Sequence, residues 1–299
     1  MRHFLNISDH PPETIRQMLD LGRRLRDQRQ RGEANDPVLA GKTLAMLFQK
    51  PSLRTRVSFE QAMYELGGHA IVLGQHEVGL GQRESVGDVT RVLSGMVHGI
   101  AARVGDHRHL VEMTASATVP VINMLSDLSH PAQALADAMT IMDEFAPGDG
   151  DVSGRTVAFV GDGNNVARSL AAICRALGMN FNLACPAPYA LPADGFINLT
   201  TDPTEAVRGA DVIYADTFVS MGEESEKKQK LAAFEGYQIN RPLVNQAADH
   251  VIVLHCLPAY RGVEITDQVM DGPRSRVFSQ AHNRLHAQKG LLAVLMGEG

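Results

Sequence analysis

The stretch VAFVGDGNNVARSL, residues 157–170, joins a run of apolar residues to a glycine-rich turn and then to a helical pattern. The apolar run is short enough for a buried strand, and the polar turn after it marks the end of that strand. A strand, a tight turn and a helix in this order make one βα unit. The same order recurs on both sides along most of the chain, which predicts α/β architecture with parallel sheets covered on both faces.

Further apolar runs along the chain fit the other strands of such sheets. Together with the first, they predict strands at Thr43–Phe48, Ala70–Leu73, Ile100–Val104, Val119–Asn123, Thr156–Val160, Phe181–Ala184, Val212–Ala215 and Val251–Leu254. At 299 residues the chain exceeds the usual size of a single core. We therefore expect two doubly wound parallel-sheet domains with a cleft between them. The stretch rich in glycine and proline at 145–155 predicts domains 1–145 and 146–282, with a last helix, about 283–299, packing back on the first.

Composition excludes several classes of protein. The formal net charge of −6 argues against general attraction to nucleic acid or to an anionic membrane. The first residues contain no apolar core of a signal peptide, and no apolar stretch is long enough to span a bilayer. Three cysteines are too few for a disulfide framework, and an odd number cannot all pair within the chain. These features predict a cytoplasmic protein that binds small molecules.

Polar clusters follow the predicted strands at the edge where open α/β sheets bind ligands. Because these clusters come from both halves of the chain, we expect them to form the binding site. They are residues 49–56, Arg103, His130, residues 161–165, Asp216 and residues 255–258.

The first cluster lies in FQKPSLRTRVSFE, residues 48–60. Ser52 is a suitable N-cap for a helix, whose first free N–H groups would favour a phosphate. Arg54 and Arg56 would add forked cationic donors and Thr55 a hydroxyl. The glycine run and the Lys-Ser/Thr ending of a Walker loop are absent. The alternative is a surface helix with two arginines.

A second cluster, HPAQ at residues 130–133, places an imidazole and a carboxamide at a helix start, with Pro131 at the first helical position. The positive end of the helix dipole would keep His130 neutral. A neutral imidazole and the Gln133 amide could hold a carbonyl oxygen and an NH2 group. The alternative is a capped helix with a surface histidine.

The turn at Gly161–Asn165 is similar to a dinucleotide-binding fingerprint. Such a site requires an acid about 20 residues further on, at the end of the next strand. That place here reads LACPAPY, and no acid follows before Asp194. A nicotinamide-dependent dehydrogenase remains a rival reading, but the side chains of Asn164 and Asn165 can instead hold a carboxylate or an amine.

Two clusters in the second half contain an acid and a thiol at strand ends. Asp216 opens DTFVSMG, and the charged run EESEKKQK at 223–230 is typical of a solvated helical face. HCLP at 255–258 is expected to expose the Cys256 thiol at a strand end, beside His255 and within reach of Asp216. Cys174 and Cys185 have apolar surroundings and indicate core positions. No CxxC or HxxxH spacing supports zinc, so no metal is expected, and His107 and His109 are expected in a loop.

Taken together, these motifs resemble the aspartate and ornithine carbamoyltransferase family. Residues 52–56 read SLRTR where the family has STRTR, and HPAQ matches the family motif H-P-x-Q. The SMG loop at 220–222 and HCLP at 255–258 match the ornithine branch. The resemblance covers nearly the whole chain, ending with NRLHAQK at 283–289. It implies transfer of a carbamoyl group from carbamoyl phosphate to the side-chain amine of ornithine, with no cofactor.

The resemblance also assigns roles to residues. Arg54, His130 and Cys256 would act in catalysis. Carbamoyl phosphate would contact Ser52, Leu53, Arg54, Thr55, Arg103, His130, Gln133, Cys256, Leu257 and Arg284. Ornithine would contact Asn165, Asp216, Ser220 and Met221. The family usually forms homotrimers or multiples of trimers.

The chain departs from the family pattern at two places. Leu53 replaces a threonine of the phosphate motif, and Gly79 stands where a glutamine usually serves a neighbouring subunit. Gln82 is the nearest candidate to replace that glutamine. Because Leu53 also occurs among relatives that act on acylated ornithine, N-acylornithine and putrescine remain alternative amine substrates. A binding module that holds anions without turnover is a third reading.

Overall fold

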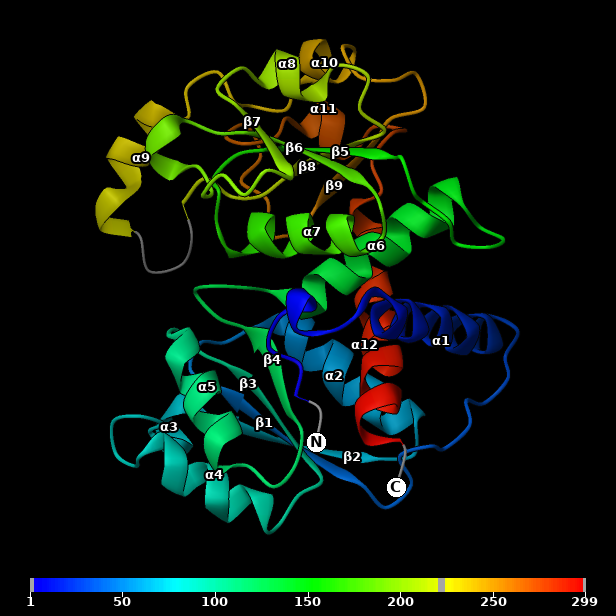
Figure 1. The fold of residues 1–299 in the computed structure, drawn as a ribbon, viewed down its shortest axis with the longest axis vertical. Helices are drawn as coiled ribbons and strands as arrows, with labels where there is room; N and C mark the ends of the chain where they lie inside the picture. Colours follow the sequence, from blue (N-terminus) through cyan, green and yellow to red (C-terminus); the bar gives the residue numbers. More distant parts are fainter. Residues whose placement is uncertain (1–2, 220–223, 298–299) are drawn as a thin grey trace. The chain divides into compact units, whose positions relative to one another are not determined.

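The computed structural model describes residues 3–219 and 224–297 of the chain (Figure 1). The chain divides into two compact units. Unit 1 comprises Met1–Met139 and His282–Gly299, and unit 2 comprises Thr140–Ala281. The two dividing points fall within helices, α6 (Pro131–Phe145) and α12 (Val277–Met296).

Unit 1 contains a four-stranded parallel sheet with the order β2-β1-β3-β4. The strands are β1 (Thr43–Phe48), β2 (His69–Gly74), β3 (Gly99–Arg103) and β4 (Val121–Leu125). In the register of β1 and β3, Phe48 pairs with Arg103. The carboxyl ends of these two strands therefore lie level, which brings the segments that follow them to one edge of the sheet.

Helices cover both faces of the unit 1 sheet. They are α1 (Pro12–Gln30), α2 (Leu53–Glu65), α3 (Gln75–Val78), α4 (Val86–Ser94) and α5 (His107–Ser116), with a short 3-10 helix at Ile7–Asp9. Figure 1 shows α4 and α5 on one side of the strands and α2 and α12 on the other. Alternate residues of β1 and β3 face α4 and α5, as the period of a strand requires. The core on that face contains Ala45, Leu47, Ile100, Ala102, Val86, Val89, Leu110 and Met113.

Helices α1 and α12 touch through their backbones. A Cβ atom placed on Gly290 would overlap the carbonyl oxygen of Met18, and one placed on Gly22 would lie 2.6 Å from the carbonyl oxygen of His286. Only glycine leaves room for this approach. The contact joins the chain's first long helix to its last one within unit 1.

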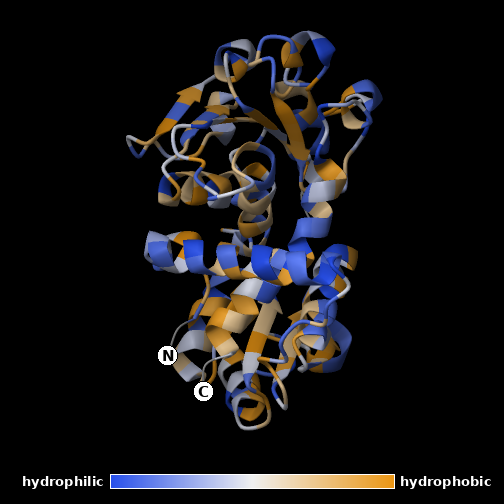
Figure 2. Cartoon of the chain, turned by 90° about the vertical axis from the view of Figure 1, so that its right-hand side faces the viewer, coloured by the Kyte–Doolittle hydropathy of each residue, from blue (hydrophilic) through white to orange (hydrophobic). Residues whose placement is uncertain are grey.

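Unit 2 contains a five-stranded parallel sheet with the order β7-β6-β5-β8-β9. Its strands are β5 (Thr156–Val160), β6 (Asn180–Ala184), β7 (Ile197–Thr200), β8 (Val212–Ala215) and β9 (Ile252–His255). The rings of Phe159 and Tyr214 stack between neighbouring strands, with centroids 5.4 Å apart. Hydrophobic residues colour most of the strands in both sheets, whereas many helices carry hydrophilic faces (Figure 2).

Short helices follow the strands of unit 2. They are α7 (Asn165–Ala176), α8 (Pro203–Val207), α9 (Lys227–Ala233), α10 (Arg241–Val244) and α11 (Asp267–Met270), with 3-10 helices at Ala187–Tyr189 and Glu224–Glu226. In Figure 1, α7 lies on one face of the sheet and α8 and α10 lie on the other.

The fold predicted from the sequence is confirmed as two doubly wound α/β units with parallel sheets. The strands at 43–48, 156–160 and 212–215 have the predicted bounds, and the one predicted at 119–123 lies at 121–125. Strand β7 was not predicted, because its INLT sequence is a half-exposed edge strand and not an apolar run. Within the described parts of the chain, no helix is both long and apolar enough to cross a membrane.

Candidate active site

Three arginines of unit 1 surround one buried histidine. Arg54 lies in the first turn of α2, Arg103 ends β3, and Arg284 comes from α12. The first turn of α2 is fixed by its predicted cap, because the Thr55 backbone N–H donates to Ser52 Oγ at 3.4 Å. His130 directly precedes α6, whose first residue is Pro131 as predicted.

Arg284 ties α12 to the two other helices of this site. Its guanidinium donates to Thr55 Oγ1 at 2.7 Å and to Gln133 Oε1 at 3.0 Å. Gln133 Nε2 in turn donates to Asp137 Oδ1 at 2.8 Å. All four side chains are buried. Since Thr55 Oγ1 is the acceptor in its bond, the Thr55 hydroxyl keeps its own proton to donate to a ligand.

The electrostatics of this cluster favour an anion. Burial and the neighbouring Arg54 lower the pKa of Arg103 to about 10. Burial, followed by Arg284, Arg103 and Arg54, holds the pKa of His130 well below its usual value. Both groups are therefore destabilised as cations, first by burial and then by the positive charge around them. The Nε atom of Arg103 is also buried without a hydrogen-bond partner among residues 3–219 and 224–297.

His130 is neutral, as predicted, but for a different main reason. The prediction invoked the helix dipole, whereas burial is the largest cause and the three arginines follow. The alternative of a surface histidine is wrong, because the His130 side chain is buried. The alternative of a surface helix with two arginines is correct for Arg56 of α2. This side chain is exposed and pairs with Glu60 at 3.1 Å.

Leu53, the first departure from the family pattern, is exposed to solvent. It is 76% exposed, so its side chain adds nothing polar to an anion site and leaves only its backbone to do so. Gly79, the second departure, is a left-handed helix cap with φ of 65°. A Cβ atom there would lie 2.6 Å from the Cβ of Arg83. The loop thus excludes a side chain at 79, while Gln82 is exposed.

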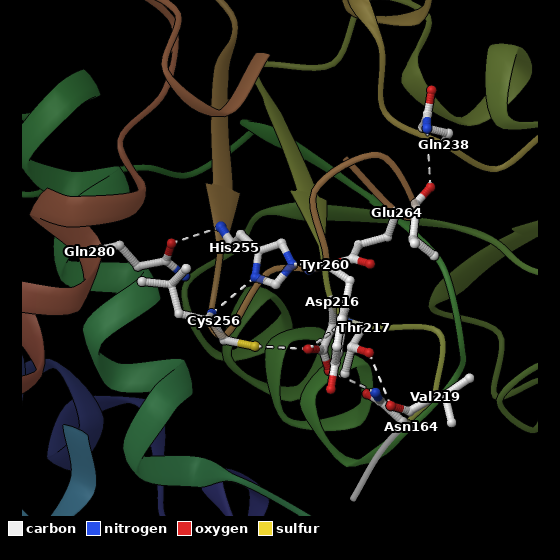
Figure 3. Close-up of polar contacts among 12 residues, drawn as sticks. Asn164, Asp216, Thr217, Val219, Gln238, His255, Cys256, Tyr260, Glu264 and Gln280 are labelled. Carbon is white, nitrogen blue, oxygen red and sulfur yellow. Dashed lines mark hydrogen bonds and ion pairs between the residues drawn. The ribbon is translucent and has the colours of Figure 1, made fainter. Parts of the chain in front are cut away.

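In unit 2, Asp216 follows β8 and receives three neutral donors (Figure 3). The Cys256 thiol donates to Oδ1 at 2.9 Å, and the Thr217 backbone N–H donates to the same oxygen at 2.8 Å. Asn164 Nδ2 donates to Oδ2 at 2.8 Å. The contact between Cys256 and Asp216 agrees with the sequence-based expectation, although the thiol is buried and not exposed.

Asn164 has two structural roles. The sequence-based prediction treated Asn164 and Asn165 alike. Its Oδ1 accepts from the backbone N–H groups of Val166 and Ala167 at 2.9 and 3.1 Å, which caps α7. Its NH2 group holds Asp216. Asn165 is the first residue of α7, and its proposed contact with ornithine stays a prediction. Ser220 and Met221 lie outside the described residues.

The HCLP segment is held by a buried histidine and a buried carboxylate. The Leu257 backbone N–H donates to His255 Nδ1 at 2.9 Å, so the ring proton must reside on Nε2. Nε2 then donates to Glu264 Oε1 at 3.1 Å. Leu257 has φ of 57°, a backbone conformation that is uncommon for residues other than glycine. The sequence reading did not identify Glu264.

One group of metal-ligand type occurs among residues 3–219 and 224–297. The ligand atoms of Asp216, His255 and Cys256 lie within 4.8 Å of one another. Both ring nitrogens of His255 are already engaged by Leu257 and Glu264, so a metal would have to displace one of these bonds.

The pair His107 and His109 lies in the first turn of α5 and not in a loop. The two rings bond to different partners. His107 Nδ1 lies 2.8 Å from Ser126 Oγ, and His109 Nδ1 lies 3.3 Å from Gln49 Nε2.

The glycine turn after β5 is filled by the chain itself. The Gly163 N–H donates to the carbonyl oxygen of Tyr189 at 3.0 Å. A Cβ atom on Gly163 would lie 2.6 Å from that oxygen and from the nitrogen of Leu191. A dinucleotide site needs this space for the pyrophosphate. The geometry therefore counts against a nicotinamide cofactor at this turn.

The charged run 223–230 was predicted to be a solvated helical face, and this is wrong for its last residue. Residues 225–229 are exposed, but Lys230 is 3% exposed and pairs with Asp162 at 2.6 Å. The apolar residues of α9 that follow Lys230 could have indicated that this side chain is buried.

Comparisons with known proteins cover almost the whole chain. Residues 2–143 match the family model "Aspartate/ornithine carbamoyltransferase, carbamoyl-P binding domain", and residues 153–295 match the companion Asp/Orn binding domain. An ornithine carbamoyltransferase of Methanopyrus kandleri is 44% identical, over 99% of this chain and 97% of that protein.

Solved structures agree with these matches. An ornithine carbamoyltransferase from Pyrococcus furiosus is 44% identical, with a TM-score of 0.94 over 100% of this chain and 98% of that one. A solved N-acetyl-L-ornithine transcarbamylase is 28% identical, with a TM-score of 0.87 over 99% of this chain and 100% of that one.

Proposed function

The chain belongs to the aspartate/ornithine carbamoyltransferase family, and from this premise we propose that it transfers the carbamoyl group of carbamoyl phosphate to the δ-amine of L-ornithine. The products are L-citrulline and phosphate. We assign carbamoyl phosphate to unit 1 and ornithine to unit 2. Full-length relatives named ornithine carbamoyltransferase, at 44% identity or above, support ornithine over acylated ornithine, for which the similar solved structure is 28% identical.

One observation carries the carbamoyl phosphate assignment: a neutral, buried imidazole among three arginines. The arginines and the free N–H groups at the start of α2 suit a phosphate dianion. In the proposal Ser52, Arg54, Thr55 and Arg103 hold the phosphate, while Arg284 completes the positive charge. Burial is the main cause of the low pKa of His130, and the positive charge of Arg284, Arg103 and Arg54, which lowers it further, would be compensated by the bound phosphate.

The carbamoyl carbonyl oxygen becomes the oxyanion of the tetrahedral intermediate. Arg54, the Thr55 hydroxyl and His130 are the donors that we assign to it. A neutral His130 can donate a hydrogen bond without adding a fourth cation beside the phosphate. Donors fixed in this way are each worth about 3–4 kcal/mol in the transition state. The carbamoyl NH2 is assigned to Gln133 Oε1 and to the backbone carbonyls of Cys256 and Leu257.

Gln133 can take this role only through one atom. Its Nε2 is used by Asp137, and its Oε1 already accepts from Arg284. A carbonyl oxygen has two lone pairs, so Oε1 retains one for the carbamoyl NH2.

Ornithine is assigned to Asp216, Asn165, Ser220 and Met221. The donors that Asp216 receives from the described part of the chain, Cys256, Thr217 and Asn164, are neutral, so it can pair with the α-ammonium group. The δ-amine has a reference pKa of about 10.4 and must lose a proton before it attacks. Binding beside the Cys256 thiol, out of water, would favour the neutral amine. No residue role in this scheme requires a metal or an organic cofactor.

The test is a colorimetric citrulline assay of the purified chain with carbamoyl phosphate and a panel of amines, together with phosphate release. The panel contains L-ornithine, putrescine, L-lysine and N-acetyl-L-ornithine. We expect L-ornithine to have the highest kcat/KM by a wide margin. A higher value for putrescine or N-acetyl-L-ornithine would replace the amine in the proposal. Phosphate release without any carbamoylated product would refute transfer itself.

The proposal extends to the oligomeric state and the cellular location of the protein. The outer face of α2 exposes Leu53, Val57 and Tyr64, at 76%, 55% and 74%. An apolar face of this kind on one helix supports burial against another copy of the chain, and we propose a homotrimer or a multiple of trimers. Size-exclusion chromatography with light scattering, which gives the molar mass in solution, tests this oligomeric state. The three free cysteines support a cytoplasmic location, and a citrulline-forming activity would belong to arginine metabolism.

A further inference from the structure

Two acids follow neighbouring strands at the carboxyl edge of the unit 2 sheet, and they differ in the charge of their partners. Asp162 follows β5, and Asp216 follows β8. Asp216 receives a thiol, an amide and a backbone N–H, all of them neutral. Within residues 3–219 and 224–297, none of these donors cancels its negative charge.

Asp162 has a cationic partner instead. Lys230 Nζ lies 2.6 Å from Asp162 Oδ2, and the two side chains are 4% and 9% exposed. The same ammonium lies 5.4 Å from the centre of the Tyr189 ring. Because water is largely excluded at this burial, the Lys230 ammonium strongly offsets the charge of the Asp162 carboxylate. Among the contacts of the described residues, Asp162 therefore has a cationic partner and Asp216 does not.

Resting on the proposed function, we propose that Lys230 is a positioning residue that neutralises Asp162, so that Asn165, at the end of the same turn, can receive the α-carboxylate of ornithine. Asp216 is then the single anion that remains for the α-ammonium. Without Lys230, a buried carboxylate would lie three residues from Asn165, to which we assign the α-carboxylate. Two like charges placed together in a water-poor site repel each other strongly.

This inference makes opposite predictions for the two partners. Lys230→Met leaves Asp162 negative and should weaken binding of an α-carboxylate. Asp162→Asn leaves a cation and should not weaken it. The double variant removes both charges and should recover. A pair that acts only as a structural tie would instead lose ligand binding in both single variants.

The experiment uses the full-length protein and L-norvaline, which has the α-amino acid end of ornithine without its δ-amine. Its inhibition constant is measured in the citrulline assay at saturating carbamoyl phosphate. The variants are Lys230→Met, Asp162→Asn, the double variant and the conservative Lys230→Arg. Lys227→Met, an exposed lysine on the same helix, is the matched control.

We expect Lys230→Met to raise the inhibition constant about tenfold or more, while Asp162→Asn, the double variant and Lys230→Arg stay within about threefold of the parent. The KM for carbamoyl phosphate should not change in any of them. Parent-like inhibition of Lys230→Met, or equal weakening in Asp162→Asn, overturns the inference. If Lys230→Met does not fold, the Asp162→Asn result alone decides. Failure of the parent chain to make citrulline would instead refute the proposed function.

Discussion

Asp216→Asn is expected to damage ornithine use through both charge and hydrogen-bond geometry. The carboxylate accepts from three donors, with Thr217 and Cys256 at Oδ1 and Asn164 at Oδ2. An asparagine must point its NH2 group at one of these sets. Asn164 cannot turn to accept, because its own oxygen caps α7 through Val166 and Ala167. One donor therefore always faces another donor.

The magnitude follows from these contacts. A hydrogen bond to a charged group contributes about 1.5–3 kcal/mol, and a buried donor without an acceptor costs about 1–3 kcal/mol. Because the protein relaxes and part of the loss also destabilises the free enzyme, we expect roughly 2–4 kcal/mol in kcat/KM for ornithine. This corresponds to about 30- to 900-fold.

The assay is citrulline formation as a function of ornithine concentration at saturating carbamoyl phosphate, with the binding of carbamoyl phosphate measured separately by calorimetry. Carbamoyl phosphate binding should be nearly unchanged, because that ligand is assigned to unit 1. A variant within about threefold of the parent in kcat/KM, or one that loses carbamoyl phosphate binding equally, would refute the assignment of Asp216 to ornithine.

Other perturbations address unit 1. Arg54→Ala should nearly abolish turnover without loss of folding, and Arg54→Lys should rescue it poorly because a point charge cannot replace a forked donor; Arg56→Ala, an exposed arginine on the same helix, should stay active in the same citrulline assay. Burial, with neighbouring cations, lowers the pKa of His286 to about 3. The unfolded chain therefore binds a proton that the native state refuses, and stability is lost as the pH falls from about 6.5 towards 3, by about 2–3 kcal/mol at pH 4.5. His286→Gln should flatten that loss in urea titrations, and an unchanged slope would contradict it. Gly290→Ala should cost about 3 kcal/mol or more by calorimetric melting because a methyl group has no room there, whereas Gly148→Ala meets nothing within 4 Å and should be neutral.

Local patterns in the sequence were sufficient for the strands, the cap at Ser52 and the helix start at Pro131. Each of these depends on residues a few positions apart, so the signal is contained in a short window. The ligand edge could also be anticipated, because parallel strands bring their carboxyl ends to one side. These rules placed Arg54, Arg103 and His130 at one edge before any contact was known.

Contacts between distant parts of the chain could not be anticipated in this way. Arg284 meets Thr55 across 229 positions of sequence, and no periodicity connects them. Lys230 was assigned to a solvated run because seven of its neighbours in that run are polar, yet its partner Asp162 lies 68 positions earlier. Asn164 and Asn165 are chemically identical, so only the geometry of the α7 cap separates their tasks.

The discontinuous course of unit 1 has a consequence for the order of events during synthesis. Unit 2 is one uninterrupted segment, Thr140–Ala281, whereas unit 1 is complete only when residues from His282 onward are present. Arg284 and the glycine at 290, which lets α12 lie against α1, are among the last residues made. Domains fold as units during translation from the N-terminus. Unit 2 can therefore complete its folding before α12, which unit 1 requires, has been synthesised. A chain that terminates early thus retains a complete second sheet but lacks Arg284, so under the proposed assignment it would offer carbamoyl phosphate two arginines in place of three.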